Sequence, residues 1–183
     1  GENPIVSPLP NTVNGIERLA KDFSNVTALL EAEASKPSFI TQAPEFDVLD
    51  IATHGSFDRG DFLQSALYFA PIGDDDSLLT VQELYRMKLR TQLAILEACE
   101  SGLGDVREGE GVMSLARAFT YAGCRSVLMS LWDVAEAQST REIMKAFYKN
   151  LCDGMPRDEA IAEAKRAFLG RARQEGGELA HLT

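Results

Sequence analysis

Apolar residues recur along the chain in two spacings, and the way the two alternate predicts the fold. Nearly continuous apolar runs of strand length predict buried strands at residues 26–30, 46–53, 66–70, 92–98 and 125–131. Apolar residues at helical spacing predict helices at residues 12–23, 80–87, 112–121, 136–152 and 156–173. Because strands alternate with helices, the sequence predicts an α/β domain with a mainly parallel sheet.

Several helix ends carry their own local signals. Thr80 and Glu83 have the spacing of a capping box at the start of the helix expected to end near Met87. Gly123 stands where a glycine commonly closes a helix, and Pro156 suits the first turn of the last helix. The glycine-rich, charged stretch at residues 100–111 is expected to form a loop.

Two reactive side chains, His54 and Cys99, each follow a predicted strand. Parallel sheets place their active sites at the carboxyl ends of strands, so we expect the two residues to meet there. A histidine can take the proton of a cysteine thiol, whose free pKa is about 8.5. The N–H groups of Gly55 and Cys99 are the expected oxyanion donors. Taken singly, Cys99 is compatible with a buried structural thiol and His54 with a turn residue.

Composition narrows the classes of function. The 183 residues suggest one domain over residues 1–183, and the net charge of −10 disfavours nucleic acid and anionic membranes as partners. A basic protein segment remains a plausible partner on charge grounds. Three widely spaced cysteines without a CxxC pair argue against a disulfide framework and a zinc site, and favour a reducing, cytoplasmic setting. The sequence has no secretory signal, no apolar run of membrane-spanning length and no nucleotide-binding glycine motif, and we expect no cofactor and no metal.

Two short motifs carry a family resemblance. ATHG at residues 52–55 and EACESG at residues 97–102 resemble the catalytic motifs of the CHAT family, which is similar to caspases and separases. The histidine of a caspase likewise precedes its nucleophile by about 50 residues. The likeness covers roughly residues 3–170. Further stretches resemble the family in the same order, at residues 9–12, 78–84, 122–127, 130–134 and 147–154.

The resemblance implies a caspase-like three-layer sandwich with helices on both faces of the sheet. It implies a cysteine endopeptidase that cleaves a protein or peptide substrate through Cys99 and His54. The resemblance also implies regulation by attached or partner domains, of which a helical-repeat domain in the same protein is one candidate. Separases take a basic residue before the cut bond, so the candidate pocket residues are Asp133, then Glu136 and Glu97, with Trp132 as a wall. Caspase-like enzymes often cleave themselves after the nucleophile, and Arg107 is the predicted position of such a cut.

This chain departs from the family pattern at three places. Glu97 stands where the family usually has serine two residues before the nucleophile. The chain begins at what resembles the end of the family's first core strand, and it stops at Thr183 without the family's tryptophan-containing strand. We therefore expect a piece of a longer protein that lacks terminal strands.

Alternative interpretations of the site and of the function remain open. Asp133 is equally suited to capping the next helix, Trp132 to packing beneath the pocket, and Glu97 to pointing into solvent. Cys124 and Cys152 lack a histidine motif and are interpreted as structural. A caspase-like fold can also serve as a catalytically silent scaffold, or as a hydrolase or acyltransferase that uses the same dyad on small molecules.

Overall fold

The computed structural model describes residues 26–56, 58, 60–73, 77–97, 99–100, 109–130 and 138–174, with the backbone alone at 99–100 and 109–113. The helix expected at residues 12–23 lies outside these ranges. Two compact units make up the chain, residues 1–135 and residues 136–183.

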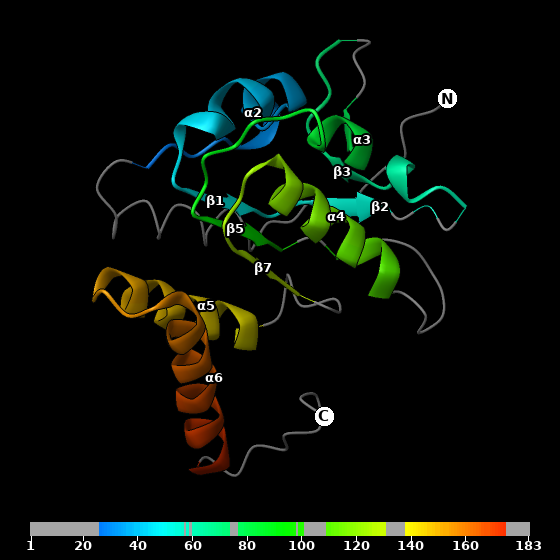
Figure 1. The fold of residues 1–183 in the computed structure, drawn as a ribbon. Helices are drawn as coiled ribbons and strands as arrows, with labels where there is room; N and C mark the ends of the chain where they lie inside the picture. The colour runs from blue at the N-terminus through cyan, green and yellow to red at the C-terminus, as the bar shows by residue number, and fades with distance from the viewer. Residues whose placement is uncertain are drawn as a thin grey trace. The chain divides into compact units, whose positions relative to one another are not determined.

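A three-stranded parallel sheet forms the centre of the first unit (Figure 1). Its order is β1 (Val48–Ile51), β5 (Leu93–Leu96) and β7 (Val127–Met129). All four residues of β5 are buried, as expected for the middle strand of a parallel sheet. The α/β class and the mainly parallel central sheet predicted from the sequence are confirmed.

A second sheet of four short strands adjoins the candidate site. Its order is β4 (Leu78–Thr80), β3 (Ala66–Tyr68), β2 (His54–Ser56) and β6 (Cys99–Glu100). The β2–β6 pair is parallel, whereas β3 runs antiparallel to both β2 and β4. The strand at residues 66–70 was predicted, but β4 was not, because its three residues merge with the apolar start of the following helix.

Three α-helices of the first unit pack on one face of the central sheet: α2 (Lys36–Gln42), α3 (Val81–Leu84) and α4 (Gly109–Ala122) (Figure 1). Short 3₁₀ turns lie at Glu31–Glu33, Ala43–Glu45 and Phe62–Gln64. Phe39 of α2 and Phe119 of α4 meet edge to face, with their ring centroids 6.5 Å apart. Their cluster includes Leu49 and Leu96 from the sheet, so one apolar core joins these helices to the central strands.

Capping chemistry sets the helix ends as the sequence predicts. The Thr80 side chain accepts from the Glu83 N–H, and the Glu83 carboxylate accepts from the Thr80 N–H. Helix α4 closes at Gly123, whose φ of +118° lies in the left-handed region that favours glycine. A Cβ atom there would stand 2.1 Å from the Leu89 carbonyl oxygen, so the close approach also requires glycine.

The second unit is a pair of helices, α5 (Gln138–Cys152) and α6 (Arg157–Gln174). Phe147 and Tyr148 of α5 are buried, as are Ala160 and Ala164 of α6. The small alanine side chains let the second helix approach closely. Gly154 turns the chain between the helices with a φ of +84°, in agreement with the predicted helix boundary.

Two local predictions are wrong. Residues 26–30 form no strand, because this apolar run finds no partner ladder among the described strands and Val26 is exposed. Helix α4 begins at Gly109 and so takes in residues 109–111, which were expected to belong to the preceding loop. Tertiary packing of its buried face outweighs the low helix propensity of Gly109 and Gly111.

Candidate active site

One parallel strand pair runs from the central sheet to the candidate site. In the central sheet Ile51 of β1 is the register partner of Leu96 of β5. Three residues further along both strand segments, His54 of β2 is the register partner of Cys99 of β6. Neighbouring strands lie about 4.8 Å apart, so the backbones of His54 and Cys99 are adjacent. The site residues lie within these short strands, just beyond the ends predicted from the sequence.

Hydrogen bonds hold the junction between the two sheets. The Glu97 N–H donates to the Ile51 carbonyl oxygen at 2.9 Å, which extends the ladder of the central sheet by one step. Between β1 and β2, the Thr53 hydroxyl donates to the Tyr68 carbonyl oxygen of β3. The residues before His54 are therefore fixed to both sheets.

The surroundings of the predicted dyad are partly described. His54 is half-buried, and Gly55 is buried between Leu67 of β3 and Glu100 of β6. Cys99 contributes its backbone to β6, and its side chain lies outside the described part. The other predicted site positions fall outside the described residues: Arg107, Trp132, Asp133 and Glu136.

A pair of carboxyl groups lies beside the junction: Asp50 belongs to β1, and Glu97 directly follows β5. Burial, followed by the negative charge of Asp50, raises the pKa of Glu97 to about 7. The Oδ1 atom of Asp50 is itself buried. Asp50 was missed in the sequence analysis, although an acidic residue inside the buried run at residues 46–53 was a usable signal.

A buried hydroxyl follows the third strand of the central sheet. Ser130 follows β7, and its N–H donates to the Leu96 carbonyl oxygen at 3.4 Å. Its Oγ atom is buried and has no hydrogen-bond partner among the described residues. Asp50, Glu97 and Ser130 thus lie on three neighbouring strand segments, at the same end of the sheet as His54 and Cys99.

The other two cysteines have different environments. Cys124 is 3% exposed and belongs to the apolar core, and burial raises the pKa of its thiol. Cys152 is exposed at the end of α5. A raised thiol pKa disfavours the nucleophilic thiolate, in keeping with a packing role for Cys124.

The fold and the pairing of a histidine strand with a cysteine strand define the class as a caspase-like α/β domain. The CHAT domain profile matches residues 2–180, and the chain belongs to the CHAT family. The match runs through both compact units.

Two curated relatives match about half of the chain. Over 89 residues it is 34% identical to Tetratricopeptide repeat protein 28 of Mus musculus and 35% identical to the protein of that name in Homo sapiens. The matched stretch is 49% of this chain and 4% of each relative. Of the helices that the structure describes, none is long and apolar enough to cross a membrane.

Proposed function

We propose that the chain is a cysteine endopeptidase domain with Cys99 as the nucleophile and His54 as its base. The Cys99 thiolate attacks the carbonyl carbon of the scissile peptide bond. The oxyanion that forms is stabilised by the backbone N–H groups of Gly55 and Cys99. His54 then gives its proton to the leaving amine. Water activated by His54 hydrolyses the thioester and restores the free thiol.

The register pairing of His54 with Cys99 is the observation that carries this proposal. Two residues 45 positions apart become backbone neighbours on parallel strands, at the carboxyl end of the central sheet. A nucleophile and its base must come within hydrogen-bond reach, and paired backbone positions on adjacent strands support such an approach.

Labelling with a peptidyl acyloxymethyl ketone tests the dyad. We expect the label on Cys99, no labelling of Cys99→Ala, and labelling about 10²- to 10⁴-fold slower in His54→Ala. Cys152→Ala is the matched control, because it removes an exposed thiol without changing the site. Label on Cys152, or equal rates in His54→Ala and the unaltered protein, would contradict the proposal.

We further propose that the peptidase prefers a basic residue before the cut bond. The support is the partly buried carboxyl pair of Asp50 and Glu97, the latter two residues before Cys99. Two residues along a strand span about 6.6 Å, which is within reach of a substrate side chain. A guanidinium or ammonium group would neutralise this pair through charge-assisted hydrogen bonds.

The ratio of two cleavage rates isolates this preference from the dyad. Two peptide substrates that differ only in having arginine or leucine before the cut are cleaved by the same catalytic residues. The ratio of their kcat/KM values therefore removes any pH dependence that comes from those residues. We expect arginine to be preferred, and the ratio to rise as Glu97 ionises near pH 7. Glu97→Gln is expected to lower the ratio by about tenfold or more. A leucine preference, or a ratio unchanged in Glu97→Gln, would refute the role of Glu97.

We also propose that the domain acts within a protein that carries helical repeats, which regulate it. The support is the similarity to two tetratricopeptide repeat proteins, although the chain spans only 4% of their length. Comparing the labelling rates of the full-length protein and of residues 1–183 tests the coupling. Equal rates would argue against regulation by the attached part.

A silent scaffold is the second candidate function, and one feature favours it. Glu97 places an acidic group where the family usually has serine, and a negative charge near Cys99 opposes formation of the thiolate. On this alternative, neither the full-length protein nor the domain labels Cys99 at any pH. Labelling that depends on both His54 and Cys99 would exclude it.

A further inference from the structure

Positive charge gathers on one edge of the first unit, although the whole chain carries a net charge of −10. Six Lys and Arg residues of this unit are described, and Lys36 pairs with Glu83 at 2.7 Å. The other five are all exposed, and none forms an ion pair with a described residue: Arg86, Lys88, Arg90, Arg117 and Arg125. We call these five residues, with Tyr85 and Tyr121, the basic edge.

Two chain segments, residues 85–91 and 117–125, hold the basic edge together. The Leu89 N–H donates to the Ala122 carbonyl oxygen at 2.6 Å, and the Arg125 N–H donates to the Thr91 carbonyl oxygen at 3.0 Å. Leu89 is buried, whereas the cations on either side of it point outward. Burial alternates along residues 88–91, so that Leu89 and Thr91 are buried while Lys88 and Arg90 are exposed to solvent.

An aromatic pair lies within the basic edge. The rings of Tyr85 and Tyr121 meet edge to face with their centroids 5.0 Å apart. Tyr121 is nevertheless 74% exposed, the most exposed of the large apolar side chains in the described part. Arg117 stands four residues earlier on α4 and therefore on the same helix face. Tyrosine and arginine are the residue types most enriched at protein interfaces.

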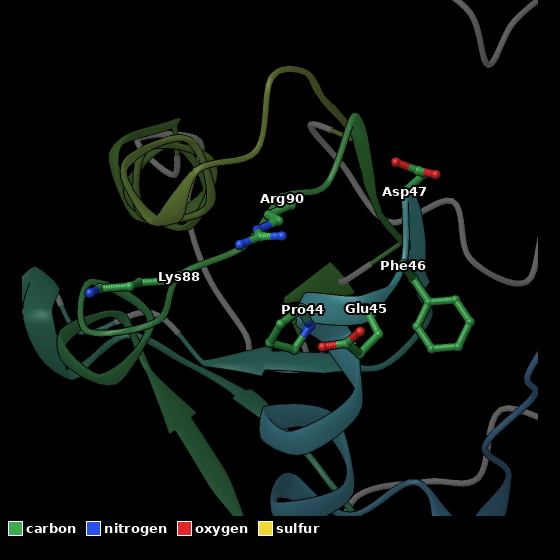
Figure 2. Close-up of a pocket in the computed structure, with 6 residues that line it drawn as sticks. All are labelled: Pro44, Glu45, Phe46, Asp47, Lys88 and Arg90. Atoms are coloured by element: carbon green, nitrogen blue, oxygen red, sulfur yellow. The ribbon is translucent and has the colours of Figure 1, made fainter.

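A cleft of about 410 Å³ opens beside Lys88 and Arg90 (Figure 2). Its other wall is formed by residues 44–47, which lead from α2 into β1 and include Glu45 and Asp47. The cleft lies before β1 and β5 begin, at the opposite end of these strands from His54 and Cys99. Lys88 and Arg90 balance Glu45 and Asp47 within the cleft, so the excess positive charge of the basic edge comes from Arg86, Arg117 and Arg125.

We propose that the basic edge docks an acidic protein segment, with Tyr121 as its apolar anchor and Lys88 and Arg90 as its main charge contacts. Five cations that form no ion pair with the described residues, together with the exposed Tyr121, match an acidic protein surface, and the net charge of −10 disfavours a nucleic acid. Glu45 and Asp47 in the cleft would accept a cation from the partner, which a protein segment can supply beside its acidic residues and a nucleic acid cannot. This surface is independent of the proposed peptidase site, which it leaves open to substrate.

Fluorescence anisotropy with a defined probe tests the docking surface. The probe is a labelled helical peptide that carries glutamates on one face and a single leucine among them, and its matched control has glutamine for every glutamate. We expect the whole 183-residue chain to bind the glutamate peptide alone, and binding to weaken between about 50 mM and about 200 mM salt.

Charge-reversal variants locate the binding. We expect Lys88→Glu with Arg90→Glu to weaken binding by about tenfold or more, and Tyr121→Ala by about tenfold. The matched control is Lys145→Glu with Lys165→Glu, which makes the same change in net charge at exposed positions of α5 and α6. Circular dichroism verifies that every variant is folded.

Three outcomes would overturn the proposal. The first is equal binding of the glutamate and glutamine peptides. The second is an effect of the Lys88 and Arg90 reversal no larger than that of the control reversal. The third is tight binding of a single-stranded RNA of equal charge, lost in the Lys88 and Arg90 variant, without binding of the glutamate peptide.

Discussion

Replacing Glu97 by glutamine should stabilise the protein at neutral and alkaline pH. In the folded protein, burial and the charge of Asp50 raise the pKa of Glu97 from 4.5 to about 7. Each tenfold change in an acid constant corresponds to about 1.36 kcal/mol, so ionising this carboxyl in the folded state costs about 3 kcal/mol. Glutamine keeps the shape and the polar atoms but carries no charge.

The sign of the pH dependence follows from proton binding in the two states. Between pH 4.5 and about 7 the unfolded chain has lost the Glu97 proton, while the folded protein still holds it. The folded state therefore binds more protons in this window, and the free energy of unfolding falls as the pH rises. Below pH 4.5 the contribution vanishes, and above pH 7 the penalty is constant.

Urea denaturation across this pH range, followed by circular dichroism, measures the effect. We expect Glu97→Gln to match the unaltered protein at pH 4.5 and to exceed it by about 2 to 3 kcal/mol at pH 8. Glu33→Gln is the matched control, because it removes the same charge from an exposed position. Asp50→Asn should give part of the same increase in the free energy of unfolding at pH 8. In the double variant, this increase should not add fully to that of Glu97→Gln. Equal stability of Glu97→Gln and the unaltered protein at pH 8 would refute the reasoning.

Three further changes test the packing. In urea denaturation, Gly123→Ala should lower the free energy of unfolding more than Gly154→Ala does. Both glycines have positive φ, but only at Gly123 does a Cβ meet another backbone, that of Leu89. Equal losses of stability in the two variants would contradict the close approach. Thr80→Ala should cost about 1 kcal/mol through loss of the capping box, and an unchanged denaturation midpoint would show the box to be dispensable. Phe119→Ala should cost about 3 to 5 kcal/mol, because this ring is fully buried, and a loss below about 1 kcal/mol would mean that the core collapses to fill the cavity.

The sequence predicts the elements with long or strongly patterned runs. The central strands and the helices α5 and α6 agree with their predicted positions, since their burial repeats at strand or helix spacing. Short elements escape this kind of reasoning. Strand β4 has three residues and exists because β3 pairs with it, and residues 26–30 are apolar yet find no partner strand among the described ones. Whether a short apolar run forms a strand depends on its neighbours in space, which a local pattern does not contain.

Prediction of the site depends on the kind of information that each residue carries. His54 and Cys99 could be predicted as the candidate site because a reactive residue after a buried strand is a local signal, and family motifs reinforced it. The interaction between Asp50 and Glu97 is not local, because it depends on how two strands 45 residues apart are aligned. The basic edge likewise arises from two segments that only the folded backbone brings together.

The alignment of His54 with Cys99 is set by packing at some distance from either residue. The same offset of 45 residues relates every partner along this strand pair, from Val48 and Leu93 to Gly55 and Glu100. Slipping one strand by a single residue would turn the buried face of β1 outward, so the apolar core opposes any other register. A residue inserted into the loops between the strands leaves this pairing intact. One inserted between Ile51 and His54 would shift the histidine past the cysteine, and it should abolish labelling of Cys99 while the core remains folded.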